Sequence, residues 1–396
     1  KSSSDWIKRV GSPEQITQCA NDAWKAANES PGNIATLIVP ADYAWSDIQS
    51  DLPKKIKLNN RKSVDNKLIE AAYKLLLKPN SMLYLGGKFL DEECLKFAAQ
   101  IATKTGCRLV TDTFVSRIRR GAGLPIIQQV PYFSEMAEDF LQGTESIVFI
   151  GTKPPVSFFA YPDKKSFLSP DEAELFELCS VEENGYETLA LLSELSGSPK
   201  IANELIRPHI SDVPTSGDLD VTTLGPLIAD MMPEESIVSD ESATSSLIVT
   251  PHALQAKPHD WLALTGGSIG QGLPLAIGAS IAKPDRPVIT LHGDGGAMYT
   301  VQALWTQARE NLNITNIIFS NRSYEILKIE LDRVQAVETG ERAASMFSMD
   351  NPPIDWVNLA ESMGVQGYKP KTVKEFKDVF SKSVNESGPS LIEIEI

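Results

Sequence analysis

Short apolar runs alternate with amphipathic stretches along most of the chain, and this alternation predicts its fold. The runs are continuously apolar, which is typical of strands buried on both faces, and the stretches between them have helical spacing. The predicted strands are Ile34–Pro40, Met82–Gly87, Cys107–Thr113, Ser146–Gly151, Ser236–Asp240, Val288–Gly296, Ile314–Asn321 and Ser390–Ile396. The predicted helices are Pro13–Ala27, Lys67–Leu77, Asp91–Gly106, Phe133–Leu141, Val221–Met232, Gly270–Ala282, Thr300–Glu310, Trp356–Met363 and Val373–Ser383. The order predicts an α/β fold with parallel sheets covered by helices on both faces.

Two polar segments interrupt this alternation and divide the chain. Ser50–Asn66 is a polar linker, and Ser196–Thr222 is rich in Ser, Pro and Gly. The predicted fold class is therefore two doubly wound parallel-sheet domains, at about 60–200 and 205–396, plus a remnant of a third at 1–50. Because one helix and one strand cannot bury a core alone, residues 1–50 are expected to dock on the rest of the chain or to lack their original partners.

The composition is that of a globular protein and excludes several classes of partner. The 396 residues are 42% hydrophobic, and 37 Lys and Arg against 52 Asp and Glu give a net charge of −15. We expect no nucleic-acid partner, since the basic clusters are short, as at Arg117, Arg119 and Arg120. We expect no membrane span either, because no apolar run approaches roughly 18 residues. The four scattered cysteines favour reduced thiols and a cytoplasmic location, with an organelle left open.

The most informative stretch is a glycine-rich turn after a predicted strand. Gly293, Asp294, Gly295 and Gly296 stand at the carboxyl end of that strand, where open α/β sheets bind ligands. A dinucleotide site of the G-x-G-x-x-G type does not fit, because Met298 stands where its last glycine should be. A carboxylate inside the turn would also repel a pyrophosphate unless a cation lay between them. The turn therefore calls for a metal ion.

The next predicted strand also ends in an oxygen donor. Asn321 follows Asp294 by 27 residues, one helix and one strand further on, so both side chains can emerge at the same sheet edge. The backbone carbonyl of Ser323 can add a third ligand. Mg²⁺ prefers oxygen ligands of these kinds, together with phosphate oxygens.

A GDG sequence followed about 27 residues later by Asn resembles the cofactor motif of thiamine diphosphate enzymes. LHGDGGAMYTVQALWTQARENLNITNIIFSNRSY is similar to that motif in the acetolactate synthase and benzoylformate decarboxylase family. TGGSIGQGLPLAIGASIA resembles the segment that precedes it, and SDESATSS resembles an upstream diphosphate-contacting loop. IATLIVPADYAW resembles the last strand of the pyrimidine-binding domain. The resemblance covers essentially the whole chain.

This resemblance implies thiamine diphosphate and Mg²⁺ as cofactors and gives roles to individual residues. The side chains of Asp294 and Asn321 and the carbonyl of Ser323 would hold Mg²⁺. The carbonyl of Gly267 would accept a hydrogen bond from the aminopyrimidine, and Ile269 would be the apolar wedge that bends the cofactor. The residues implied to contact the diphosphate are Ala243, Thr244, Gly295 and Gly296.

Plainer structural alternatives stay open for these residues. Asp294 can stabilise its turn by an Asx-type hydrogen bond, and Ile269 can be an ordinary core residue. Ala243 and Thr244 can form a plain helix-start loop. We expect His292 to pack within its strand. Leu327 and Glu330 belong to a predicted helix. By default we expect them on its solvated face, although family enzymes use this helix near the substrate.

The chain departs from the family pattern in three ways. Ser320 replaces the first of two usual Asn residues, which leaves the metal ligand in place. Ala160 stands where the decarboxylase branch carries an active-site His. The family's activating glutamate lies in a pyrimidine-binding domain that precedes everything here. No catalytic residue can therefore be assigned, and the chain alone is expected to be incomplete for catalysis.

The expected function is that of a thiamine diphosphate-dependent transferase or lyase acting on a small-molecule 2-oxo acid. The leading prediction is decarboxylation and carboligation of the acetolactate synthase type. A benzoylformate decarboxylase-like 2-oxo acid decarboxylase, a 2-hydroxyacyl lyase, and a non-catalytic cofactor-binding homologue or inactive fragment are the alternatives. The acetolactate synthase branch binds FAD in its central domain. No FAD is expected here, because GGKFLDEE is a generic strand-to-helix turn. Since family sites form between subunits, the intact protein is expected to be a homodimer or homotetramer.

Overall fold

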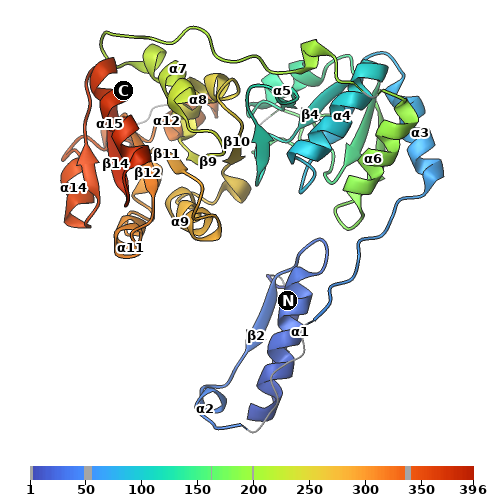
Figure 1. Ribbon diagram of the computed structural model, residues 1–396, viewed down its shortest axis with the longest axis horizontal. Coiled ribbons are helices and arrows are strands. Elements are labelled where there is room, and N and C mark those ends of the chain that lie inside the picture. The colour runs from blue at the N-terminus through green and yellow to red at the C-terminus, as the bar shows by residue number, and fades with distance from the viewer. Residues whose placement is uncertain (1–2, 49–55, 162, 199, 335–339) are drawn as a thin grey trace.

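A computed structural model describes residues 3–48, 56–161, 163–198, 200–334 and 340–396. Figure 1 shows two larger α/β parts side by side, with a small N-terminal unit set apart at the end of an extended segment. Residues 50–55 of the predicted linker lie outside the described residues. Within the described part of the chain, no helix is long and apolar enough to cross a bilayer.

The N-terminal unit contains one strand more than predicted. It consists of β1 (Trp6–Arg9), a 3-10 turn, α1 (Ile16–Asn28), β2 (Ala35–Ile38) and α2 (Ala41–Ala44), and β1 pairs with β2 in parallel. Its buried apolar core is only Val10 and Cys19, while Trp24 and Trp45 are 50% and 85% exposed. The unit therefore leaves most of its apolar surface in solvent.

The central sheet has five parallel strands in the order β6-β4-β3-β7-β8. The first of these strands in chain order, β3, lies in the middle and later strands add on both sides, so the sheet is doubly wound. The strands are β3 (Ser81–Leu85), β4 (Arg108–Thr111), β6 (Gln128–Gln129), β7 (Ser146–Ile150) and β8 (Glu174–Cys179). Helices α3, α4 and α6 cover the face of Leu83 and Leu85, and α5 covers the face of Met82 and Tyr84. Their bounds are α3 (Asn66–Leu76), α4 (Glu92–Thr105), α5 (Ser134–Leu141) and α6 (Gly185–Ser196).

Local sequence explains why these elements begin and end where they do. The Asp91 carboxylate caps α4 by accepting the N–H of Cys94 at 2.9 Å. Gly106 ends the same helix in the left-handed conformation, with φ of 76°. The predicted bounds Asp91–Gly106 therefore correspond to the cap residues of the observed helix.

The C-terminal sheet has seven strands in the order β13-β14-β12-β11-β9-β10-β5, and all but β5 are parallel. The strands are β9 (Ile237–Glu241), β10 (His259–Leu262), β11 (Val288–Gly293), β12 (Ile314–Ser320), β13 (Gln366–Tyr368) and β14 (Ser390–Glu395). The helices are α7 (Val221–Met231), α8 (Ser246–Ala253), α9 (Gly272–Ala282), α10 (Asp294–Ala297), α11 (Ala303–Arg309), α12 (Glu325–Arg333), α13 (Glu341–Ser345), α14 (Trp356–Ser362) and α15 (Val373–Asn385). These two sheets confirm the predicted fold class.

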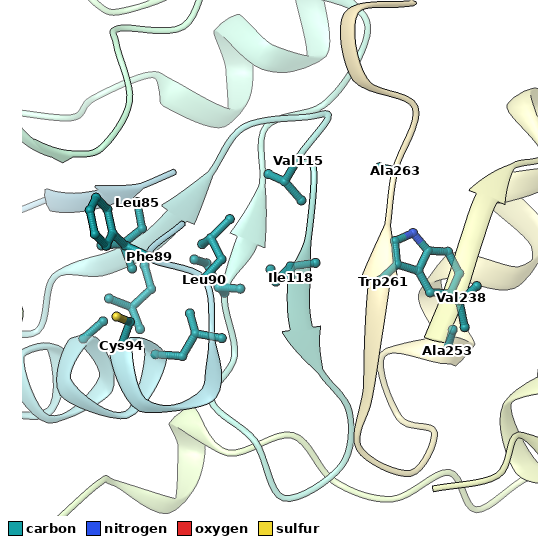
Figure 2. Packing of buried hydrophobic residues seen from close by; sticks show 14 of the residues in the cluster. Leu85, Phe89, Leu90, Cys94, Val115, Ile118, Val238, Ala253, Trp261 and Ala263 are labelled. Carbon is teal, nitrogen blue, oxygen red and sulfur yellow. The ribbon is translucent and has the colours of Figure 1, made fainter. Parts of the chain in front are cut away.

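The edge strand β5 (Ile118–Arg120) comes from residues that the sequence assigns to the central domain. It pairs antiparallel with β10, with Ile118 opposite Trp261. Figure 2 shows the consequence: buried side chains run from Leu85 and Phe89 through Ile118 to Trp261 and belong to one cluster. The two sheets thus share a continuous apolar core, and the predicted domain boundaries stay a prediction.

Candidate functional site

Two neighbouring strands of the C-terminal sheet end at the same place. β11 and β12 are paired in parallel, with Gly293 opposite Phe319. Asp294 follows β11 as the first residue of α10, and Asn321 follows β12. The spacing of 27 residues therefore brings both side chains to one sheet edge, as predicted. Whether they bind a metal there stays a prediction.

The Asp294 carboxylate is buried and has no cationic side chain beside it. Its Oδ2 accepts the backbone N–H of Arg322 at 2.7 Å, and its Oδ1 accepts that of Gly295 at 2.8 Å. Burial raises the pKa of Asp294, and these backbone hydrogen bonds act in the opposite direction. Among the described residues, no Lys or Arg lies within ion-pair distance of it. A buried carboxylate of this kind suits a cation, since each oxygen keeps a free lone pair.

The other two predicted ligands lie in the loop after β12. The Oδ1 of Asn321 accepts the N–H of Ser323 at 2.9 Å. These three residues supply one carboxylate, one amide and one carbonyl. No group of three or more His, Cys, Asp or Glu side chains suited to a metal occurs in the described part of the chain. The candidate site is thus a mixed oxygen site rather than a cluster of acids.

The two glycines after Asp294 stand where larger residues would not fit. A Cβ on Gly295 would lie 2.7 Å from the Tyr324 ring, and one on Gly296 would lie 3.0 Å from the His292 ring. A third loop reaches the same edge from β9, where Ala243 adopts a left-handed φ of 50° and is exposed. Thr244 beside it is half-buried. The four residues predicted for the diphosphate are therefore brought to one edge.

The loop before α9 carries Gly267 and Ile269. Gly266 and Gly267 have φ of 64° and 63°, a conformation that favours glycine. The carbonyl of Gly267 accepts the N–H of Ile269 at 2.9 Å and keeps a second lone pair. Ile269 is 51% exposed, so the alternative that it is an ordinary core residue is wrong.

A buried Glu–His pair supports this loop, and the sequence analysis did not single out Glu241. Glu241 and His292 are opposite each other on β9 and β11, with Oε2 3.2 Å from Nε2. The Glu241 carboxylate also accepts the N–H of Gly272 at 2.7 Å and that of Gly270. Burial would raise the pKa of Glu241, but the adjacent His292 side chain and these amides lower it overall. The expectation that His292 packs within its strand is confirmed.

Helix α12 is fastened to the central part of the chain. Glu330 accepts the hydroxyls of Tyr161 at 2.6 Å and Tyr132 at 3.3 Å. Arg333 forms a bidentate ion pair with Glu135, at 2.6 and 2.9 Å. The Glu330 side chain is only 17% exposed, so the prediction of a solvated face is wrong for it. Leu327, by contrast, is exposed.

An aromatic cluster adjoins the same loop. It consists of Phe114, Tyr132, Phe158 and Phe159, whose neighbouring ring centroids are 4.9 to 6.0 Å apart. A Cβ on Gly267 would lie 3.2 Å from Phe158 Cζ, so the ring borders the loop that carries the predicted wedge. Ala160 follows Phe159 directly. The position at which the resemblance implies the His of the decarboxylase branch therefore adjoins this aromatic cluster, and that correspondence stays a prediction.

The central sheet is tightly packed at the edge where a flavin nucleotide would be expected. Its topological switch point lies between β3 and β7, where such sheets bind nucleotides. There the Phe89 ring packs so tightly that a Cβ on Gly151 or Gly185 would lie 2.4 or 2.6 Å from it. Figure 2 shows Phe89 inside the core beside Leu85. This packing favours the expectation that no FAD binds, which stays a prediction.

Comparisons with known proteins agree with this site. Residues 243–394 match the family described as thiamine pyrophosphate enzyme, C-terminal TPP binding domain. The Mycobacterium tuberculosis (strain H37Rv) protein named "Putative acetolactate synthase large subunit IlvX" is 38% identical, over 99% of this chain and 75% of its own length. Benzoylformate decarboxylase of Pseudomonas aeruginosa is 25% identical, over 52% of this chain and 40% of its own length.

Solved structures show the same fold. The Rhodococcus jostii RHA1 thiamine diphosphate-dependent 4-hydroxybenzoylformate decarboxylase matches with a TM-score of 0.81 and 23% identity, over 99% of this chain and 76% of that one. Benzoylformate decarboxylase from Polynucleobacter necessarius matches with a TM-score of 0.81 and 20% identity, over 99% and 76%. These structures show the fold, and the extended match to the mycobacterial protein shows the family. It belongs to the thiamine diphosphate-dependent enzymes, in the family of the acetolactate synthases and benzoylformate decarboxylases.

Proposed function

We propose that this protein is a thiamine diphosphate- and Mg²⁺-dependent enzyme that decarboxylates a 2-oxo acid and ligates the product to a second carbonyl compound, as an acetolactate synthase does. One observation carries the proposal: Asp294 is buried at the edge between β11 and β12 without a cationic partner, and Asn321 and Ser323 lie in the adjoining loop. An uncompensated buried carboxylate is costly, and a divalent cation removes that cost.

The residues of this chain would hold the cofactor through its metal and its diphosphate. Asp294, Asn321 and the carbonyl of Ser323 would bind Mg²⁺. The residues that would contact the diphosphate are Ala243, Thr244, Gly295 and Gly296. When bound, thiamine diphosphate supplies a nucleophilic carbon and an electron sink for decarboxylation.

The protein's own contribution would be to position groups and to exclude water. Glu241 holds the loop of Gly267 and Ile269 through the amides of Gly270 and Gly272. Gly267 would then accept a hydrogen bond from the aminopyrimidine, and the exposed Ile269 would press against the bent cofactor. The aromatic cluster beside them presents an apolar wall to the substrate.

We propose the sequence-based organisation along with this function. Residues 1–50 would form part of a pyrimidine-binding domain, 60–200 the central domain and 205–396 the diphosphate-binding domain. The exposed Trp24 and Trp45 of the first region support an assembly of subunits, as a homodimer or homotetramer, because large apolar patches commonly mark interfaces. A cytoplasmic location stays part of the proposal.

A decarboxylase of aromatic 2-oxo acids is the second candidate. The aromatic cluster favours it, since Phe158 and Phe159 are 45% and 47% exposed beside Gly267 and can stack on a substrate ring. Ala160 counts against a direct transfer of the decarboxylase mechanism, because it cannot transfer a proton.

A product assay separates the candidates. The longest native form of the protein is supplied with thiamine diphosphate, Mg²⁺ and either pyruvate or benzoylformate, with Asp294→Ala as the matched control. Acetolactate from pyruvate supports the synthase proposal. Benzaldehyde from benzoylformate, without acetolactate, supports the decarboxylase. No turnover of either acid, together with no stabilisation by the cofactor, would contradict both.

A further inference from the structure

The arginine cluster of β5 contains one side chain without a counter-ion. Arg117 forms a bidentate pair with Asp260, at 2.8 and 3.2 Å. Arg119 pairs with Glu235. Arg120, the last residue of the strand, forms no ion pair in the part of the chain that the structure describes. The three arginines stand close together in sequence, yet only two are balanced by a carboxylate.

Arg120 is also the most deeply buried of the three. It is 4% exposed, and its Nε and Nη2 atoms have no hydrogen-bond partner among the described residues. The flat face of its guanidinium lies over Trp261, 3.5 Å from the ring centroid, so the edge that carries the N–H groups is left unused. Unsatisfied donors on a buried cation are costly unless a molecule from outside the chain accepts from them.

The electrostatic surroundings of Arg120 do not replace that missing acceptor. Burial lowers the pKa of Arg120 to about 9; the charge of Asp240 acts in the opposite direction, and that of Arg207 lowers the pKa further. The Asp240 carboxylate accepts the N–H and the hydroxyl of Ser242, at 3.0 and 2.6 Å. Both of these hydrogen bonds end on Oδ1, and Asp240 forms no ion pair with Arg120 in the described part of the chain.

A small cavity is lined by both Arg120 and Arg207. It has a volume of about 10 Å³, and its polar side chains are those of Arg120, Arg207 and Gln129. That volume holds about one water-sized particle. The Arg207 side chain forms no hydrogen bond or ion pair in the described regions. The cavity is thus lined by two cations and has no acid in its walls.

We propose that this cavity is a binding site for a single small anion of the size of chloride, held between Arg120 and Arg207. An anion accepts hydrogen bonds from both guanidinium groups and balances their charge, whereas a water molecule accepts but leaves the charge uncompensated. The small volume favours a monatomic anion over a phosphate, a nucleotide or the 2-oxo acid substrate. The site is separate from the one at Asp294, which lies on the opposite side of β9 in the strand order.

The position of the site gives the anion a structural effect. Arg120 ends β5, the strand that the C-terminal sheet takes from the central part of the chain. Arg207 belongs to the segment between the sheets, and it exchanges backbone hydrogen bonds with Gly123 and Leu124, each at 2.9 Å. A bound anion would fasten the end of β5 to this connecting segment and stabilise the junction of the two sheets.

Thermal unfolding of the full chain tests the proposal. Chloride replaces gluconate at constant ionic strength and neutral pH, since gluconate is too large for the cavity. We expect a saturating rise in Tm of about 2–4 °C. Arg207→Gln should remove this rise, and it is expected to fold because Arg207 is only half-buried. Arg117→Gln is the control on the same strand and should keep it.

Crystals grown with bromide provide a second, independent measurement. An anomalous peak between the guanidinium groups of Arg120 and Arg207 is expected. Density for water alone, without an anomalous signal, would overturn the proposal. So would a wild-type Tm that is equal in chloride and gluconate, or a chloride response that Arg207→Gln retains, since bromide in the crystal would then be an adventitious ion only.

Discussion

The central and C-terminal sheets share one design but differ at their carboxyl edges. Each places an aspartate after a parallel strand, the half-buried Asp112 after β4 and the buried Asp294 after β11. Asp112 accepts the hydroxyls of Tyr84 and Thr152, at 3.0 and 2.7 Å. Asp294 is instead held by the backbone amides of Gly295 and Arg322. Side chains thus satisfy the first acid, whereas backbone groups hold the second.

A doubly wound fold alone therefore does not make a ligand site. Both sheets are doubly wound, and both present glycine turns at the edge where ligands bind. In the central sheet, Phe89 fills the crevice and Thr152 covers the acid. In the C-terminal sheet, three loops meet at this edge, and among the described residues no side chain takes the place that Phe89 has in the central sheet. Whether a ligand site forms at such an edge depends on whether side chains already occupy it.

The largest effect is expected from Asp294→Ala. Loss of a metal ligand should reduce turnover by about 100-fold or more and abolish the Mg²⁺-dependent rise in Tm that thiamine diphosphate gives. Asp112→Ala is the matched control in the other sheet and should keep that rise. If Asp294→Ala keeps it as well, Asp294 is not a metal ligand.

Phe89→Ala should be the next largest change, and it acts on stability. Removing a buried aromatic side chain costs about 3–5 kcal/mol, and the cavity left behind opens the central crevice. Urea unfolding measures the loss.

The wild-type protein should purify without a flavin absorbance band; such a band would show that the crevice is not closed by Phe89.

Glu241→Gln tests the support of the cofactor loop. The variant keeps the shape of the side chain but removes the charge that binds two backbone amides and His292. We expect thiamine diphosphate to bind about 10-fold more weakly, as for residues that orient ligands. A titration followed by intrinsic fluorescence measures the affinity, and an unchanged Kd would refute the positioning role.

The same carboxylate predicts a pH dependence of stability. The pKa of Glu241 lies below its usual value of 4.5 in the folded protein. Its contribution is therefore fully present above that pH and is lost as the pH falls through the lower, folded pKa. The difference in unfolding free energy between wild type and Glu241→Gln should shrink below about pH 4.5. A difference that grows on acidification would contradict this sign.

The smallest effect is expected from Tyr161→Phe. It removes one of the two hydroxyl groups that bind Glu330 and should cost about 1 kcal/mol of unfolding free energy. Chemical denaturation measures this change. Because Tyr132 still binds Glu330, turnover should fall only a few-fold, and a loss comparable to that of Asp294→Ala would show that Tyr161 contacts the reacting groups.

Much of the frame could be predicted from the sequence because its strands are locally distinctive. The runs ending at Gly293 and Asn321 are predominantly apolar, so the elements and their common edge follow from patterning. Strand β5 could not be predicted in this way. Its sequence, Ile-Arg-Arg, has no strand pattern, and its place depends on pairing with β10, more than 100 residues later.

The supporting contacts of the site could not be predicted for a related reason. Glu241 and His292 meet because β9 and β11 are neighbours in register, and a single sequence does not give strand order. Glu330 meets Tyr132 across 198 residues. Long-range contacts of this kind turn a solvent-facing pattern into a buried one, which is why the helix periodicity of α12 was misleading.

The exchange of β5 has a consequence for any attempt to separate the halves of this protein. A shortened gene starting after residue 200 would encode every parallel strand of the seven-stranded sheet but not its antiparallel edge. Such a product would leave the backbone of β10 unpaired and Trp261 uncovered, which invites aggregation through the bare edge. A recombined gene would have to keep residues 118–120 together with the C-terminal half. The structural unit that must be inherited together is therefore not contiguous in the chain.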